Sequence, residues 1–344
     1  MINISEIIKS IPAYIGDLRK PKFSWDFNCR FTCLPQYLSS GYCVNCHLLC
    51  FKSYRELFND PKKFQLTNVT EIKLPPLIAR FPTNISNSVI QSLDLEIMQK
   101  YTFTIPYPLI RKNFLRKLLT NESIDFFIDH AISDFSLVNN WNPEMSIRDA
   151  KRLNRDLLVF SSELGINAKA HPQVARGIWN YSVNTYQALQ EHFSPIFSIP
   201  SSANLRFVEK YFSRVLERLA PAAFMFYIGG SPPNEYKQIL NVIKYLFKVE
   251  PELNLVIFGM SSPSRILDLI EIGVKSFATH DWIYKNNFLF HNENWFDMKE
   301  VDIEIDNYKD KRTRELTPLE RHVLFATYNL ESLTGYIKEK ISEV

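Results

Sequence analysis

Apolar and polar residues follow one another along the chain in a pattern that predicts alternating strands and helices. Short apolar runs rich in Ile, Val and Phe are typical of buried strands, whereas longer segments repeat apolar residues at helical spacing. The predicted strands are 72–80, 102–106, 125–132, 166–170, 196–199, 222–228, 253–258 and 275–279. The predicted helices are 85–99, 109–119, 145–163, 174–191, 204–219, 234–248, 263–272 and 317–341. This alternation predicts an α/β fold, a (β/α)8 TIM-like barrel, with an open doubly wound sheet as the alternative.

The stretch 255–282 shows the strand, helix, strand pattern most clearly. An apolar run ends at a glycine, Ser262 is placed to cap the following helix, and Pro263 suits its first position. Gly273 ends that helix, and a second apolar run begins at once. Three polar residues follow this run: Thr279, His280 and Asp281. Because chemistry in such units gathers at the carboxyl ends of strands, these residues are candidates for an active site.

The start of the last predicted helix is also marked in the sequence. Thr317-Pro-Leu-Glu320 has the spacing of a capping box, in which the first and fourth residues exchange hydrogen bonds. Pro318 falls at the first helical position, where its missing N–H has no cost.

Composition restricts the classes of protein that fit. The 344 residues are 46% hydrophobic and 14% aromatic, which suits a packed globular chain, and the net charge is only +3. No run of 18 apolar residues occurs, and the amphipathic N-terminus does not resemble a signal peptide, so we expect a cytoplasmic protein without a membrane partner. Nine glycines leave no room for a glycine-rich phosphate loop.

All five cysteines lie in one segment, with the pattern Cys29-x3-Cys33-x9-Cys43-x2-Cys46-x3-Cys50. Clustered thiolates at such spacings suit the tetrahedral shell of Zn²⁺, and four thiolates also hold an iron–sulfur cluster. We expect Zn²⁺ on Cys29, Cys33, Cys43 and Cys46, with Cys50 or His47 as substitutes. The alternatives are free core cysteines or disulfides. The sequence thus predicts a small Cys-rich, metal-binding N-terminal module, 1–68, and a barrel domain, 69–344.

Several segments carry a family resemblance. Gly273-Val-Lys-Ser-Phe-Ala-Thr279, the strand and Gly-Gly loop 222–232, the segment 125–154 and the helix around 327–333 together resemble the tRNA-guanine transglycosylase superfamily. The resemblance implies a barrel that exchanges guanine in a nucleic acid for a 7-deazaguanine. It also implies a C-terminal zinc site, but residues 300–325 contain no cysteine, so the N-terminal cysteines are not that site.

Two departures from the family concern catalysis. The family places a nucleophilic aspartate where this chain has Ala278, and the family's Asp-Ser-Gly motif is absent. Asp281 lies three residues further on, which is roughly 10 Å in extended chain, so it replaces the nucleophile only if the backbone turns back. Its other interpretation is a turn or cap residue. His280 is a candidate base or phosphate contact or a solvated loop residue, and Asp134 is a candidate acid or an Asx-turn residue.

The resemblance also suggests where a base would bind. Gly229 and Gly230 would let backbone amides approach a planar base, Gln173 would pair with its edge, and Ala278 and Trp282 would lie beside it. Gln173 stands in a predicted loop after His171, where an ordinary loop role is the alternative. Trp141 and Trp179 are further candidates for the pocket, although most tryptophans serve in cores or interfaces.

Two basic segments of the chain indicate nucleic acid as a partner. Basic and aromatic residues mix in 107–117 and 307–314, which suits a nucleic-acid backbone or an ordinary solvated surface. The leading hypothesis is a nucleic-acid base transglycosylase that inserts a 7-deazaguanine such as 7-cyano-7-deazaguanine into DNA or tRNA. The alternatives are an inactive nucleic-acid-binding subunit that partners an active homologue, and an unrelated barrel enzyme with a metal module. A homo- or heterodimer is the expected assembly.

Overall fold

The computed structural model describes most of the chain from residue 194 onward and parts of 72–160. The described residues are 72–82, 85–106, 123–129, 158–160, 186, 194–199, 205–228, 233–285, 287–297 and 316–344. They divide into two compact units: the first contains Ile72 and the described residues of 129–227 and 248–253, and the second contains those of 73–128, 228–247 and 254–344. The predicted Cys-rich module 1–68 lies outside the described residues.

Parallel strands form a curled sheet in the second unit. It contains β1 (Leu77–Arg80), β2 (Thr102–Pro106), β7 (Leu255–Phe258) and β8 (Ser276–Thr279). β1 pairs with β2 on one side and with β8 on the other, and β8 also pairs with β7. β3 (Phe126–Asp129) follows β2, with the Phe103 N–H donating to the Asp125 carbonyl at 3.0 Å. The first and last strands of the α/β succession are therefore neighbours.

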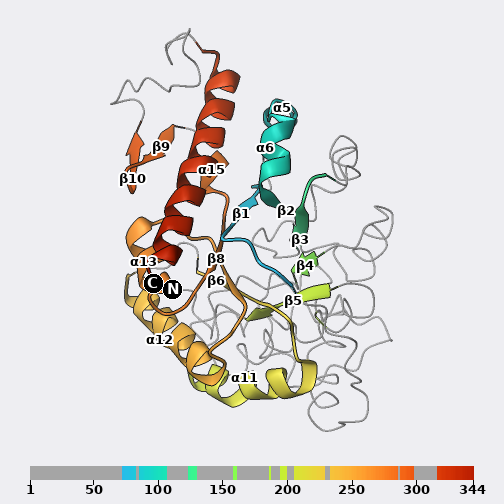
Figure 1. Cartoon of the computed structure of the whole chain (residues 1–344), viewed down its shortest axis with the longest axis vertical. Coiled ribbons are helices and arrows are strands. Elements are labelled where there is room, and N and C mark those ends of the chain that lie inside the picture. Colours follow the sequence, from blue (N-terminus) through green and yellow to red (C-terminus); the bar gives the residue numbers. More distant parts are fainter. Residues whose placement is uncertain are drawn as a thin grey trace, which may run out of the picture. The chain divides into compact units, whose positions relative to one another are not determined.

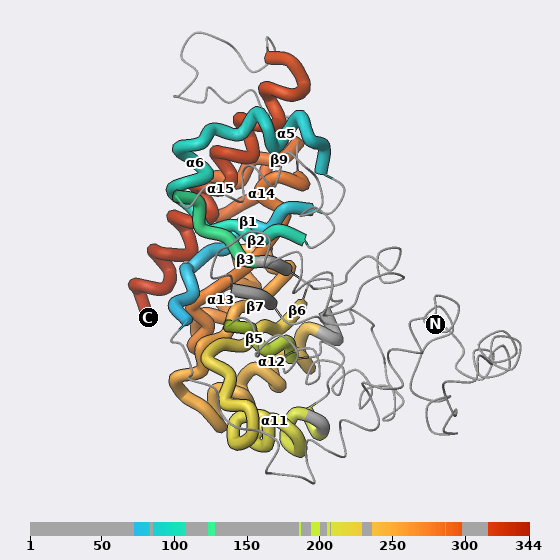
Figure 2. The backbone as a smooth tube through the Cα atoms, turned by 90° about the vertical axis from the view of Figure 1, so that its right-hand side faces the viewer, coloured from blue at the N-terminus to red at the C-terminus, as the bar shows by residue number. Residues whose placement is uncertain are grey.

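Helices and one hairpin complete the second unit. The helices are α5 (Asn87–Gln91), α6 (Leu95–Lys100), α12 (Pro233–Val249), α13 (Pro263–Ile270), α14 (Asp281–Tyr284) and α15 (Pro318–Ser342). The hairpin pairs β9 (Phe288–His291) with β10 (Asn294–Asp297) and lies along α15 (Figure 1). In Figure 2 the blue and cyan segment 72–106 lies beside the red α15, and Lys100 pairs with Glu331 at 2.9 Å. No helix within the described ranges has both the length and the apolar character needed to cross a membrane.

The two faces of the sheet in the second unit differ in what covers them. Successive residues of a strand face opposite sides, and the register aligns Ala79 with Phe103 and with Thr279. Phe103 contacts the indole ring of Trp282 in α14, with 5.8 Å between ring centroids, so helices cover this face. The opposite face carries three residues that bear on the site: Arg80, Thr104 and Ala278.

The first unit repeats the parallel arrangement on a smaller scale. β4 (Leu158–Phe160) pairs with β5 (Ser194–Ile199), which pairs with β6 (Phe224–Tyr227), and α11 (Leu205–Leu219) connects the last two strands. Phe197, Phe212, Phe224 and Tyr186 form its aromatic core, with centroids 5.4–5.9 Å apart. Phe212 lies on the apolar face of α11, and its contact with Phe224 of β6 packs that face against this sheet.

Most predicted elements in the described residues are confirmed, and three predictions are wrong in part. The helix predicted over 145–163 contains β4, because the apolar run at 157–160 suits a helix face and a short strand equally. The helix predicted over 85–99 is broken into α5 and α6 by Asp94, which accepts the N–H of Glu96 at 3.0 Å and caps α6. Ser262 precedes α13 as predicted, but its side chain makes no capping bond.

The other residues predicted to begin or end α13 and to begin α15 are found in those positions. Pro263 begins α13, and Gly273 follows it at φ +114°, a conformation that side-chain-bearing residues rarely adopt. A Cβ at this position would also lie 3.3 Å from the Phe247 ring. Thr317 and Glu320 form the complete capping box at the start of α15, with the Glu320 N–H donating to the Thr317 hydroxyl at 3.2 Å.

Candidate functional site

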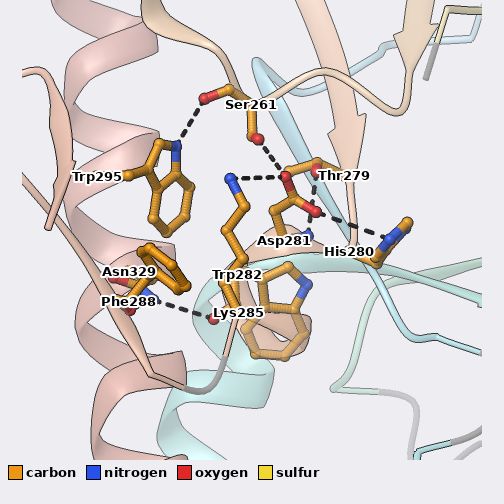
Figure 3. A network of polar contacts seen from close by, with 9 residues as sticks. All are labelled: Ser261, Thr279, His280, Asp281, Trp282, Lys285, Phe288, Trp295 and Asn329. Carbon is orange, nitrogen blue, oxygen red and sulfur yellow. Dashed lines mark hydrogen bonds and ion pairs between the residues drawn. The ribbon is translucent and has the colours of Figure 1, made fainter. Parts of the chain in front are cut away.

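Three groups hold Asp281 at the carboxyl ends of β7 and β8: two engage its carboxylate and one accepts its backbone N–H. The Ser261 hydroxyl, just past β7, donates to Oδ2, and the Lys285 ammonium lies 3.2 Å from the same oxygen (Figure 3). The Asp281 N–H donates to the Thr279 hydroxyl at 3.1 Å. The side chain remains 23% exposed. Asp281 is therefore fixed in orientation while one oxygen, Oδ1, lies on the side of His280.

His280 stands between the end of β8 and the start of α14. Its Nε2 is 3.7 Å from Asp281 Oδ1, which is too long for a hydrogen bond, and its side chain is 28% exposed. Among the residues that the structure describes, its buried Nδ1 has no hydrogen-bond partner. Burial and then the charge of Arg80 lower the pKa of His280, a shift that Asp281 opposes and Lys285 reinforces. A lowered pKa favours the neutral imidazole at pH 7, the form that is able to accept a proton.

Arg80 and Thr104 lie on the face of the sheet that α14 does not cover. They are partners in the register of β1 and β2, and both are buried. His280 comes two residues after Ala278, which pairs with Ile78, so His280 follows β8 at the level where Arg80 ends β1. The influence of Arg80 on the pKa of His280 agrees with this placement. The carboxyl ends of β7, β8, β1 and β2 thus contribute polar side chains to one edge of the sheet.

Thr104 offers a direct stability test because its buried hydroxyl has no partner within the described residues. Thr104→Val keeps the shape and removes the unsatisfied group, so we expect the free energy of unfolding to rise by about 1 kcal/mol. Urea denaturation measures this change. Thr334→Val is the matched control, since the Thr334 hydroxyl donates to the Leu330 carbonyl at 2.6 Å and its removal brings no gain. A Thr104→Val protein no more stable than the parent would mean that the hydroxyl is satisfied in solution.

The charges around His280 predict opposite effects for two substitutions. Lys285→Met removes a cation that lowers the pKa of His280, so that pKa should rise; Asp281→Asn removes an anion that raises it, so that pKa should fall. NMR titration of the imidazole resonances measures both. Lys338→Met, at an exposed position of α15, serves as the control and should leave the titration unchanged. Equal titration curves for all three variants would contradict the arrangement around His280.

Trp282 and Ala278, both predicted to lie beside a bound base, are fully buried in the structure. The indole N–H of Trp282 donates to the Arg80 carbonyl at 3.0 Å, and its ring meets Phe81 and Phe103 edge-on. Ala278 lies within β8 between Ile78 and Phe258 of the neighbouring strands. These contacts give Trp282 a packing role that fixes α14, and hence Asp281, on the end of the sheet.

Several predicted site residues fall outside the described residues. They are Asp134, Gln173, Gly229, Gly230, Trp141, Trp179 and the proposed metal ligands Cys29, Cys33, Cys43 and Cys46. Within the described ranges, no group of three or more His, Cys, Asp or Glu side chains is arranged to hold a metal ion. Of the predicted catalytic residues, the structure therefore describes His280 and Asp281, which lie together after β8, and Asp134 is not among the described residues.

Four residues of the site were not predicted from the sequence. Ser261 and Arg80 follow a general signal, since each is a polar residue at the carboxyl end of a strand. Lys285 stands four residues after Asp281 on a helix, the spacing at which such a pair meets. Trp295 belongs to the β9–β10 hairpin, whose turn residues Asn292 and Glu293 both have positive φ, as a two-residue hairpin turn of this type requires. Of these residues, Lys285 alone is a close neighbour of Asp281 in sequence, whereas the other three reach the site from other elements.

The comparisons with known proteins identify no family for this chain. No protein-family model matches it, and no curated protein matches it. The function of the chain is therefore inferred from its own residues and their geometry.

Proposed function

We propose that the chain is a (β/α)8 barrel enzyme that exchanges guanine for a 7-deazaguanine, such as 7-cyano-7-deazaguanine, in DNA or tRNA. The pairing of β1 with both β2 and β8 supports the barrel, because an open doubly wound sheet does not bring its first and last strands together. The observation that carries the function is the fixed, partly exposed carboxylate of Asp281 beside the neutral His280, at the carboxyl end of β8. Active sites of such barrels lie at this end.

The turn after β8 supports Asp281 as the replacement for the carboxylate that the family has at the position of Ala278. An extended chain would carry Asp281 roughly 10 Å away from that position. Instead α14 begins at Asp281, so the backbone turns immediately, and the carboxylate lies over the end of β7 beside Ser261. A carboxylate in this place lies at the carboxyl ends of the strands, and Ala278 can remain buried within β8.

The proposed reaction is a double displacement. Oδ1 of Asp281 attacks C1′ of the target nucleotide, the C1′–N9 bond breaks, and the departing guanine anion takes a proton from solvent. The incoming base then gives its N9 proton to neutral His280 while N9 attacks C1′, and the bond to Asp281 breaks. His280 returns its proton to solvent, so the exchange is balanced. The target base leaves its stack before this reaction.

A second function, that of an inactive nucleic-acid-binding subunit that partners an active homologue in a heterodimer, is favoured by two observations. Ala278 stands fully buried where the family has its nucleophile. In addition, Ser261 and Lys285 both engage Oδ2 of Asp281, as they would if the carboxylate served only to tie β7 to α14. In that case the chain would bind DNA or tRNA and an active homologue would supply the chemistry.

The test follows radiolabelled guanine and 7-cyano-7-deazaguanine into tRNA and into duplex DNA. Label incorporated by the unaltered chain supports the enzyme, and the nucleic acid labelled identifies the substrate. Incorporation only after Ala278→Asp, with folding checked by circular dichroism, favours the disabled subunit. Binding of tRNA or DNA without incorporation by either protein also favours the subunit. If neither nucleic acid binds, both proposals are wrong.

The metal proposal has a separate test. Zn²⁺ on Cys29, Cys33, Cys43 and Cys46 would give a colourless protein with about one zinc per chain by elemental analysis. An iron–sulfur cluster would instead give a brown protein that contains iron. Neither result affects the assignment of Asp281 and His280.

A further inference from the structure

Trp295 contacts both of the groups that hold the Asp281 carboxylate. Its indole N–H donates to the Ser261 carbonyl at 2.9 Å, and the Lys285 ammonium lies 4.1 Å from the centre of its ring (Figure 3). Ser261 and Lys285 in turn engage the same oxygen of Asp281. One side chain from the β9–β10 hairpin thus completes a closed set of contacts around the candidate nucleophile.

The hairpin that carries Trp295 is itself fixed to α15. The buried side chain of Asn329 accepts the Phe290 N–H at 2.6 Å and donates to the Phe288 carbonyl at 2.9 Å. Phe290 is the cross-strand partner of Trp295, and their rings meet edge-on at 5.2 Å. Trp295 therefore occupies a defined position, supported from α15, and is able to determine the position of the groups it contacts.

We propose that Trp295 is a positioning residue, which fixes the Asp281 carboxylate for attack through Lys285 and Ser261. The inference rests on the proposed function, in which Asp281 is the nucleophile. The face of an indole ring attracts an ammonium group, so Trp295 holds Lys285 on the Oδ2 side of the carboxylate. Oδ1 is left for the substrate. Held in this way, the carboxylate needs no reorganisation before attack, and a displacement of about 1 Å can cost 10²-fold in rate.

Two substitutions separate the contributions of Trp295. Trp295→Phe keeps an aromatic face for Lys285 and loses the N–H to Ser261, so we expect kcat for base exchange to fall about 10-fold. Trp295→Leu loses both contacts, so we expect a fall of about 10²-fold. In both variants KM for the nucleic acid should be unchanged, because Trp295 acts on the position of Asp281. Phe296→Leu is the control: the next residue of the hairpin lies on its other face and is 37% exposed.

A readout without catalysis comes from NMR. In the unaltered chain the methylene protons beside the Lys285 ammonium should be shifted upfield by the Trp295 ring. Trp295→Leu should abolish this shift and raise the pKa of His280, because released Lys285 no longer holds its charge nearby. Phe296→Leu should change neither quantity. This measurement works whether or not the chain catalyses base exchange.

The combined outcomes separate the two proposals. If the unaltered chain exchanges bases and Trp295→Leu retains the kcat of Phe296→Leu, the enzyme assignment stands and the positioning role is wrong. If no protein exchanges bases but the Lys285 and His280 resonances respond only to Trp295→Leu, the assignment of function is wrong and Trp295 still fixes the position of these groups. Resonances that do not respond to Trp295→Leu overturn the inference in either case.

Discussion

Asp281→Asn is expected to abolish base exchange while leaving the protein folded. Removal of a nucleophile lowers kcat on the order of 10⁴-fold or more. The amide still accepts the Ser261 hydroxyl, but it cannot form the covalent bond to C1′ and it loses the charge that pairs with Lys285. Because this pair is partly exposed, the loss of stability should stay within about 1 kcal/mol. The label-incorporation assay measures the rate, and urea denaturation measures the stability.

Asp268→Asn is the matched control for this substitution. It makes the same chemical change at an exposed carboxylate of α13, which accepts the Tyr236 hydroxyl at 3.2 Å. We expect Asp268→Asn to retain full exchange activity. An active Asp281→Asn protein would exclude Asp281 as the nucleophile, and equal losses in both variants would mean that the effect is not specific to the site.

Trp282→Ala is expected to destabilise the chain by about 3–5 kcal/mol, the usual cost of removing a large aromatic side chain from a core. The indole is fully buried and meets the stacked rings of Phe81 and Phe103 edge-on, and its N–H donates to the Arg80 carbonyl. Its loss leaves a cavity where α14 meets β1 and removes one hydrogen bond to the Arg80 carbonyl. Urea denaturation should show the midpoint falling sharply, and Asp281 should lose its fixed position even in protein that remains folded.

Tyr284→Ala provides the comparison within the same helix. Tyr284 is 57% exposed, so its removal should change the free energy of unfolding by no more than about 0.5 kcal/mol. A Trp282→Ala protein as stable as Tyr284→Ala would contradict the buried position of the indole. It would also favour the prediction that Trp282 lies beside a bound base over a purely structural role.

Local signals in the sequence were sufficient to predict helices whose ends are marked by capping residues, proline or glycine. The capping box at Thr317 and the proline and glycine around α13 predicted helices that the structure contains. The prediction was wrong at β4, where a three-residue strand follows a polar helical pattern and periodicity cannot separate the two states. It also missed the break at Asp94, because the apolar spacing of α5 and α6 continues across it.

Only those residues of the site that are also neighbours in sequence could be predicted. His280 and Asp281 were identified because they follow directly after a strand. Ser261, Arg80 and Trp295 reach the same edge from other elements, and their contribution depends on strand register and on the anchoring of the hairpin by Asn329. Such tertiary contacts leave no periodic signal. The sequence likewise does not determine whether Trp282 is buried, because an indole near a strand end suits a pocket and a core equally. Its packing against the neighbouring rings buries it.

The adjacency of β1 and β8 has a consequence for how the chain folds. The two strands are separated by roughly 200 residues, and the hydrogen bond from Trp282 to Arg80 spans 202 positions. Until β8 has been synthesised, β1 therefore has an open edge that can pair with another chain. Folding rates fall as the separation of contacting residues grows, so this late pairing favours slow folding. An incomplete chain that ends before residue 276 should consequently aggregate more readily than the full sequence, although it lacks only β8, the last strand of the parallel sheet, and the segments that follow it.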